Sequence, residues 1–109
     1  MIRNVPSEKP VLLKDIINIR ENQIISKVIT DSEHIHMTVL AFAENEDVSE
    51  EKYPGDIIYY SICGTALITN EDGKVHTLHE GEILLVKKGC LHAVKGQGGI
   101  KILQIIVEE

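Results

Sequence analysis

The sequence predicts an all-β fold, a small sandwich or barrel of antiparallel strands. Short runs rich in Ile, Val, Leu and Thr recur along the chain, and turn-forming residues, glycine above all, separate them. No stretch of the second half has the length and periodicity of a ten-residue helix. With 109 residues, the chain is expected to form one domain, residues 1–109, large enough for a single hydrophobic core.

Two strands are predicted in the first half. Residues 23–30 and 34–43 are apolar and β-branched, and the polar turn between them indicates an antiparallel hairpin. The pair Asp72-Gly73 is a strong signal for another hairpin. Further glycine turns are expected at 80–81, 88–89 and 96–99. Between these turns six more strands are predicted, at residues 57–63, 65–70, 74–78, 83–86, 91–94 and 100–107.

Two segments are expected outside the body of the barrel. Residues 1–20 are predicted to form an N-terminal arm or edge segment, and the apolar stretch 11–19 fits either one helical turn or an irregular edge strand. Residues 44–51 are acidic and lack apolar periodicity, so they are expected to form a solvated loop or a lid.

Charge and cysteine content narrow the class of protein. The formal net charge of −6 argues against nucleic acid or an anionic membrane as a partner, because phosphates would be repelled. No apolar run is long enough to span a membrane, and no secretory leader is visible. A cytoplasmic protein is therefore expected, with Cys63 and Cys90 as free thiols.

Two glycine-punctuated stretches carry the signal for function. The first runs from Tyr53-Pro54-Gly55-Asp56 through an apolar strand to Gly64, and the second runs from Gly81 through Gly89 to His92. Together they resemble the two signature motifs of the cupin family, small β-barrels whose hollow centre often holds a metal ion. The resemblance covers residues 36–107 and implies a double-stranded antiparallel β-barrel, a two-sheet jelly roll.

The same resemblance implies that most metal ligands are missing. The positions of the two histidines and the glutamate of the family's first motif fall on Glu51, Tyr53 and Ile57. In the second motif Gly81, Gly89 and His92 match, and Lys87 replaces a proline. His92 and Glu51 are then the candidate metal ligands, with Asp56 or Tyr53 as further oxygen donors. Transition-metal sites usually have three or four ligands, so a divalent metal is expected to bind weakly or not at all.

The resemblance also implies a pocket inside the barrel. His92 is expected to face the interior, either as a ligand-binding residue or as a hydrogen-bonded residue of the wall. Tyr59 and Ser61 share a strand face with Ile57, which points inward in the family, so they either bind a small polar ligand or fill the barrel. Glu51 completes the predicted polar set. The apolar wall is expected to comprise Ile57, Ile83, Leu85 and Val94.

The other histidines and the cysteines have simpler interpretations. His34 and His36 share a strand face, and a solvated strand end is favoured over a metal site there. His76 and His79 point to opposite faces of an extended strand, and both are predicted on the surface. Cys90 lies two residues from His92, but no oxyanion-hole signature accompanies the pair, so nucleophilic catalysis is not favoured.

Three functions remain open at the level of sequence. The first is a cupin that binds a small molecule in its cavity. The second is a metal-dependent enzyme of dioxygenase or isomerase type, and the third is a non-catalytic interaction domain. A homodimer is also predicted, because a small sheet sandwich has exposed edges. The arm is predicted to form the interface, through its apolar side chains Leu12, Leu13, Ile16 and Ile17.

Overall fold

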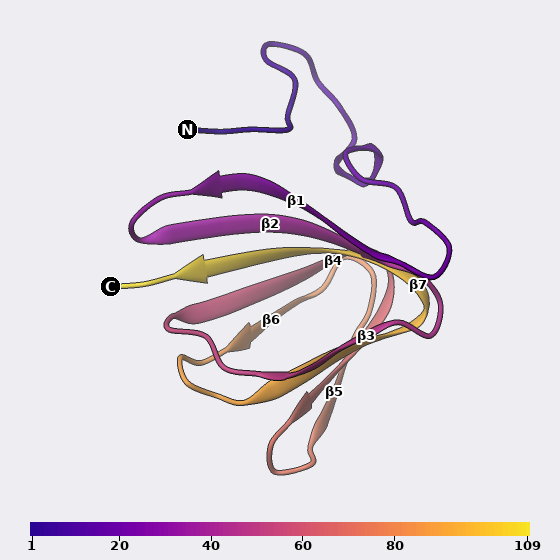
Figure 1. Ribbon diagram of the computed structural model, residues 1–109, viewed down its shortest axis with the longest axis vertical. Coiled ribbons are helices and arrows are strands. Elements are labelled where there is room, and N and C mark those ends of the chain that lie inside the picture. The colour runs from indigo at the N-terminus through magenta and orange to yellow at the C-terminus, as the bar shows by residue number, and fades with distance from the viewer.

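The chain folds as two antiparallel sheets that face each other around an apolar interior. The computed structural model describes all residues, 1–109. It contains one short 3₁₀ turn and seven strands (Figure 1). These elements are η1 (Leu13–Asp15), β1 (Ile24–Asp31), β2 (Ile35–Phe42), β3 (Asp47–Glu51), β4 (Asp56–Asn70), β5 (Val75–Leu78), β6 (Ile83–Val86) and β7 (His92–Val107). None of the helical segments is long and apolar enough to cross a membrane.

The two longest strands connect the sheets. The first half of β4 pairs with β6 and with the second half of β7, which in turn pairs with β2 and then β1. The second half of β4 pairs with β5 and with the first half of β7, which also pairs with β3. The predicted jelly roll is therefore confirmed, but β5 and β6 have no pairing with each other, so the barrel is not closed.

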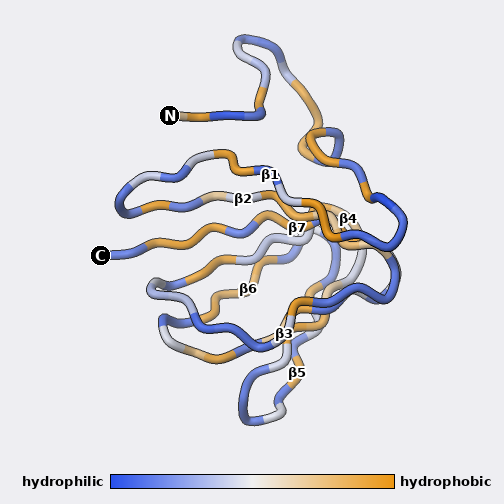
Figure 2. Tube along the Cα trace, in the orientation of Figure 1, coloured by the Kyte–Doolittle hydropathy of each residue, from blue (hydrophilic) through white to orange (hydrophobic).

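Strand alternation produces the interior. Successive side chains of a strand point to opposite faces, and the inward positions of both sheets form one core cluster. Hydrophobic residues follow the strands and hydrophilic residues gather at the turns (Figure 2). The buried members of this cluster are Phe42, Ile57, Tyr59, Ala66, Ile68, Leu78, Val86, Val94, Ile100, Ile102 and Ile106.

The N-terminal arm packs on the outer face of its own sheet. Ile17 is buried in a second apolar cluster with Ile29, Val39 and Ala41. Lys101 and Lys27 donate their ammonium groups to backbone carbonyls of the arm, those of Lys14 at 2.6 Å and Ile16 at 3.0 Å. The arm therefore covers part of the apolar face between β1, β2 and β7, which leaves less of it free to contact a partner.

The sequence places several strand boundaries wrongly. Strands predicted at 57–63 and 65–70 are one strand, β4, and those predicted at 91–94 and 100–107 are one strand, β7. Gly64 and the predicted turn 96–99 are irregularities within these strands, where the register between β4 and β7 shifts. A Cβ atom on Gly64 would lie 2.6 Å from the carbonyl oxygen of Gly99, so two backbones approach closely there.

The acidic stretch 44–51 is likewise only partly a loop. Its second half forms β3, an edge strand that pairs with β7. Val48 is the only apolar side chain of β3, and it packs against the core while its neighbours face solvent. A five-residue edge strand with one buried side chain gives almost no periodic signal, which explains the miss.

Candidate functional site

The polar part of the interior lies where β3, β4 and β7 meet. His92 pairs with Glu51 of β3 on one side and with Asn70 of β4 on the other. Tyr59 and Gln104 pair with each other across β4 and β7 on the opposing sheet. Directly paired residues project to the same face of a sheet, so two polar rows face each other across the barrel.

A hydrogen-bond network joins these rows. The Tyr59 hydroxyl lies 2.7 Å from Nε2 of His92, and the Gln104 amide donates to the same hydroxyl at 3.2 Å. Tyr59 and His92 are both buried, with exposed fractions of 1% and 2%. Their rings meet edge to face with centroids 5.6 Å apart. The network therefore fills the centre of the barrel.

The second imidazole nitrogen fixes the direction of these bonds. Nδ1 of His92 lies 2.9 Å from the backbone carbonyl of Cys90, so it carries a proton and donates. Nε2 is then the acceptor for the Tyr59 hydroxyl, and that hydroxyl accepts from Gln104. Every buried side-chain polar atom finds a partner in this way.

The two interior phenols remain protonated at neutral pH. Burial raises the pKa of Tyr59 well above the usual value for a phenol, although the Gln104 amide opposes this shift. Burial also raises the pKa of Tyr53, and its hydrogen bond to the Glu51 carboxylate adds to the effect. Both groups therefore act as hydrogen-bond donors in this site.

Glu51 and Tyr53 form the outer end of the site. The Tyr53 hydroxyl donates to the Glu51 carboxylate at 2.8 Å, and the Tyr53 ring lies 5.8 Å from that of His92. Glu51 is exposed although it is the cross-strand partner of His92. Glu51 therefore lies at the solvent side of the network.

Ser61 and Ile57 lie deeper. The buried Ser61 hydroxyl donates to the carbonyl of Gly64 at 2.6 Å, where it supports the irregular part of β4. Ile57 is packed in the apolar core. The structure thus brings both His92 and Gln104 into contact with the Tyr59 hydroxyl, and it gives Ser61 a backbone partner. The roles of all these residues toward a ligand stay predictions.

The residues at the family's metal-binding positions do not fit a metal ion. Ile57 offers no ligand atom, the Tyr53 hydroxyl is bonded to Glu51, and Nε2 of His92 is occupied by Tyr59. No three side chains of His, Cys, Asp or Glu converge so as to hold an ion. A metal at His92 would first require the Tyr59 bond to break.

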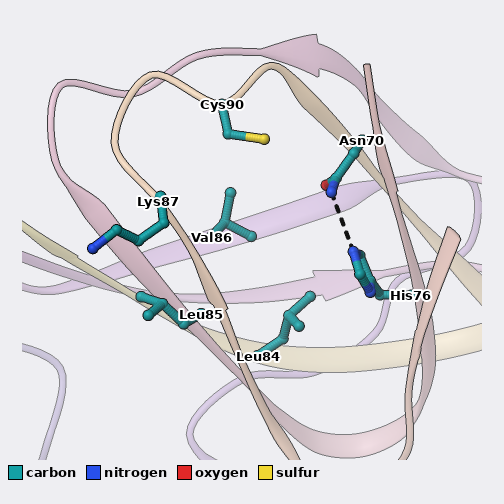
Figure 3. Close-up of a pocket in the computed structure, with 7 residues that line it drawn as sticks. All are labelled: Asn70, His76, Leu84, Leu85, Val86, Lys87 and Cys90. Carbon is teal, nitrogen blue, oxygen red and sulfur yellow. Dashed lines mark hydrogen bonds between the residues drawn. The ribbon is translucent and has the colours of Figure 1, made fainter. Parts of the chain in front are cut away.

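A cavity of about 170 Å³ opens next to this network, between β5 and β6 (Figure 3). The Asn70 amide donates to Nε2 of His76 at 3.2 Å, and the two side chains point toward one another. The cavity is lined by Asn70, His76, Leu84, Leu85, Val86, Lys87 and Cys90. None of the polar pocket residues predicted from sequence lines it, whereas the predicted wall residue Leu85 does, and Asn70 is the cross-strand neighbour of His92.

Three residues of the site are not among the pocket residues predicted from the sequence. Asn70, His76 and Gln104 each stand two positions from a buried apolar residue of the same strand, respectively Ile68, Leu78 and Ile102. Strict period-two alternation would have placed all three inside. His76, predicted at the surface, is half-buried and lines the cavity, whereas His79 is exposed as predicted.

On β6 the sequence analysis assigns the wrong alternate residues to the apolar wall of the barrel interior. Ile83 and Leu85 are 65% and 53% exposed, and the inward residues are their neighbours Leu84 and Val86. A run of four apolar residues gives no alternation from which the phase could be read. Ile57 and Val94 are buried as expected.

The His34 and His36 pair is a strand end, as predicted, but His36 is not simply solvated. Its two ring nitrogens face carboxylates on opposite sides, that of Asp31 and that of Glu108 at 2.5 Å. The hydrogen bonds that the ring donates to these carboxylates, the one to Asp31 most strongly, raise the pKa of His36 above its usual value of 6.5. His34 is exposed and bonds the backbone near the C-terminus. Cys63 and Cys90 are free thiols.

Solved structures with this fold come from several bacteria. A cupin superfamily protein from Desulfitobacterium hafniense is 35% identical over 100% of this chain and 99% of its own, with a TM-score of 0.95. A cupin 2 conserved barrel domain protein from Leptotrichia buccalis is 27% identical over 88% of this chain and 46% of its own, with a TM-score of 0.84. A conserved protein of unknown function from Streptococcus pyogenes is 22% identical over 99% and 94%, with a TM-score of 0.94.

Two facing antiparallel sheets linked by two long shared strands define a jelly-roll protein of the double-stranded β-helix class. Because the Desulfitobacterium protein is similar in sequence along the whole chain, this protein belongs to the cupin superfamily. No protein-family model and no curated protein sequence matches it.

Proposed function

We propose that this cupin binds a small polar molecule beside the Tyr59–His92–Gln104 network, without a resident metal. The observation that carries the proposal is the buried bond between the Tyr59 hydroxyl and Nε2 of His92, which uses the nitrogen that a metal would need. The barrel centre is thereby a neutral set of donors and acceptors. Such groups recognise hydrogen-bonding ligands in a mostly apolar pocket.

The cavity between β5 and β6 is the proposed entrance to this network. It places the Asn70 amide, the His76 ring and the Cys90 thiol around one space, with apolar residues of β6 on the other side. At about 170 Å³ it is smaller than the sites that hold drug-sized ligands, which are roughly 300–1,000 Å³. The ligand is therefore a small molecule, and a larger one would need the cavity to open.

Native mass spectrometry of gently purified protein tests this proposal. We expect a fraction of the protein to carry a small molecule, and we expect His92→Ala and His76→Ala to lose it. His79→Ala is the matched control, because His79 is exposed and lies on the neighbouring turn. A ligand that is retained by both interior variants, or protein that never carries one and binds no member of a fragment library by NMR, would refute the proposal.

A second candidate, the interaction domain, is favoured by one specific observation. Several large apolar side chains are exposed on the sheet that β6 forms with β4, β7, β2 and β1. Among them are Ile35, Ile83, Leu85 and Val107, each at least 41% exposed. Exposed apolar surface on a small protein marks a contact with another macromolecule. We propose that this surface serves a homodimer.

A further inference from the structure

The cavity between β5 and β6 contains a polar pair whose hydrogen-bonding capacity is only partly used. The Asn70 amide nitrogen donates to Nε2 of His76 at 3.2 Å, and neither side chain makes another hydrogen bond within the protein. Every buried side-chain polar atom has a partner, so the Asn70 side-chain oxygen and Nδ1 of His76 are accessible. Both residues line the cavity, so a molecule in it can reach these free atoms (Figure 3).

The direction of the Asn70–His76 bond defines what the free atoms can do. An amide nitrogen only donates, so Nε2 of His76 accepts and the proton of the neutral ring is on Nδ1. Nδ1 is therefore a free donor, and the Asn70 side-chain oxygen is a free acceptor. A ligand that satisfies both atoms must offer an acceptor as well as a donor.

The lining of this cavity presents no charged group to the Asn70–His76 pair. Lys87 is the only lysine, arginine or carboxylate residue of the lining, and its side chain is 74% exposed. Its ammonium group lies 3.5 Å from the Asp56 carboxylate and points away from the pair (Figure 3). Glu82 belongs to an adjoining cavity, where its carboxylate accepts a backbone N–H. An ion bound beside the pair would therefore lose water without meeting an opposite charge, which is unfavourable.

The size and the walls of the cavity limit the rest of the ligand. Leu84 and Val86 are the inward residues of β6, and they supply apolar surface beside the polar pair. The volume of about 170 Å³ is equivalent to about six water molecules in the liquid. The ligand is therefore expected to have about six non-hydrogen atoms, some of them in a short aliphatic part.

Given the proposed function, the binding of a small molecule in this cavity, we propose that the ligand is an uncharged carboxamide with a short aliphatic chain. Its carbonyl oxygen accepts from Nδ1 of His76, and its N–H donates to the Asn70 side-chain oxygen. An amide carries this acceptor and this donor side by side without a charge. Its aliphatic part lies against Leu84 and Val86.

Three molecules with the same branched carbon skeleton test the ligand class. Isobutyramide is uncharged, isobutyrate is an anion and isobutylammonium is a cation. Titration of the full chain, followed by ¹H–¹⁵N NMR that includes the side-chain amide of Asn70, measures the affinity of each. We expect isobutyramide to bind with a Kd of about 1–10 mM and to shift the Asn70 side-chain signal. Either ion should bind at least about tenfold more weakly, because the cavity offers no opposite charge.

Two substitutions of Asn70 separate recognition from packing. Asn70→Leu nearly keeps the size of the side chain but removes its donor and acceptor, so it should weaken isobutyramide binding at least about tenfold. Asn70→Asp places a carboxylate in the cavity, so it should bind isobutylammonium more tightly than the wild type does. His79→Ala is the control, because His79 is exposed, and it should bind all three molecules as the wild type does. Circular dichroism verifies that each variant is folded.

The possible results distinguish the ligand class from the proposed function. Wild-type binding of either ion at least as tight as that of isobutyramide would overturn the carboxamide and would still support a small-molecule site. An isobutyramide affinity that Asn70→Leu leaves unchanged would also overturn it. So would a wild-type protein that binds none of the three at about 10 mM. The proposed function is refuted only if the native mass spectra and the fragment library are negative as well.

Discussion

Two histidines of this protein occupy opposite kinds of environment. His92 lies in the barrel centre, where a phenol donates to one ring nitrogen and a backbone carbonyl accepts from the other. His36 lies at the end of a hairpin, where each ring nitrogen faces a carboxylate. The first arrangement suits an imidazole with one proton, and the second suits an imidazolium with two. The partners, rather than the residue type, determine what each histidine does.

His92 is placed to contact a ligand, whereas His36 is placed to stabilise the fold. The network around His92 adjoins a cavity and occupies the position where cupins often hold a metal. The carboxylates around His36 belong to β1 and to the C-terminal end of the chain, so they tie a hairpin to the last strand. We therefore expect changes at His92 to affect the barrel centre and binding, and changes at His36 to affect stability in a pH-dependent way.

The largest expected effect is the replacement of His92 by alanine. The change removes a buried imidazole, leaves a cavity and deprives the Tyr59 hydroxyl of its acceptor. We expect a loss of about 3 kcal/mol in the free energy of unfolding, more than the ~1 kcal/mol of an average substitution, with the fold retained. Urea unfolding followed by circular dichroism measures it. A loss no larger than that of the exposed control His79→Ala would show that the network contributes nothing to stability.

The second-largest expected effect is a gain in the affinity for metal when the missing ligands are restored. Glu51→His, Tyr53→His and Ile57→Glu restore three ligand groups at the family's positions, and Tyr59→Phe frees Nε2 of His92. We expect the fourfold variant to bind Zn²⁺ at least about a hundredfold more tightly than the wild type, because it completes a four-ligand site. Titration calorimetry measures this, with Tyr59→Phe alone as the control.

The metal content of the wild-type protein can contradict this account of the metal-binding position. Elemental analysis after gentle purification should find transition metal well below one ion per chain. One tightly held ion per chain would mean that Tyr59 yields Nε2 of His92 to a metal, and the metal-free function would be wrong.

The smallest expected effect concerns His36 and pH. Because Asp31 and Glu108 raise the pKa of His36 above 6.5, the stabilisation is fully present below pH 6.5 and is lost as the pH rises through the raised value. His36→Gln should therefore lower the unfolding midpoint at pH 6 and leave it unchanged at pH 10. Thermal melts of both proteins across this range test the sign. A deficit that is constant with pH would show that packing, rather than charge, is lost.

The sequence identifies the strands and the family better than the site. The hairpin signal Asp72-Gly73 and the β-branched runs correctly predict most strands, since these are local preferences. The breaks at Gly64 and 96–99 are predicted as turns but are irregularities within β4 and β7, because only the neighbouring strand decides whether a glycine turns or bulges.

The site depends on contacts between distant strands, which a single sequence does not reveal. His92 could be found from its motif, but its bond to Tyr59 spans 33 residues and that of Gln104 to Tyr59 spans 45. Asn70 and His76 were within reach of period-two alternation, because each shares a face with a buried apolar neighbour. The sequence does not show which residues of β6 face inward, since all four of them are apolar.

The tautomer of His92 is the most direct measurement of what the barrel centre can do. Long-range ¹H–¹⁵N NMR of the histidine rings reports which nitrogen carries the proton and whether the other accepts a hydrogen bond. We predict that Nδ1 carries a proton and that the Nε2 signal moves when Tyr59 is replaced by phenylalanine. A proton on Nε2, or an Nε2 signal that is unaffected by Tyr59→Phe, would contradict the network on which the metal-free binding site is based.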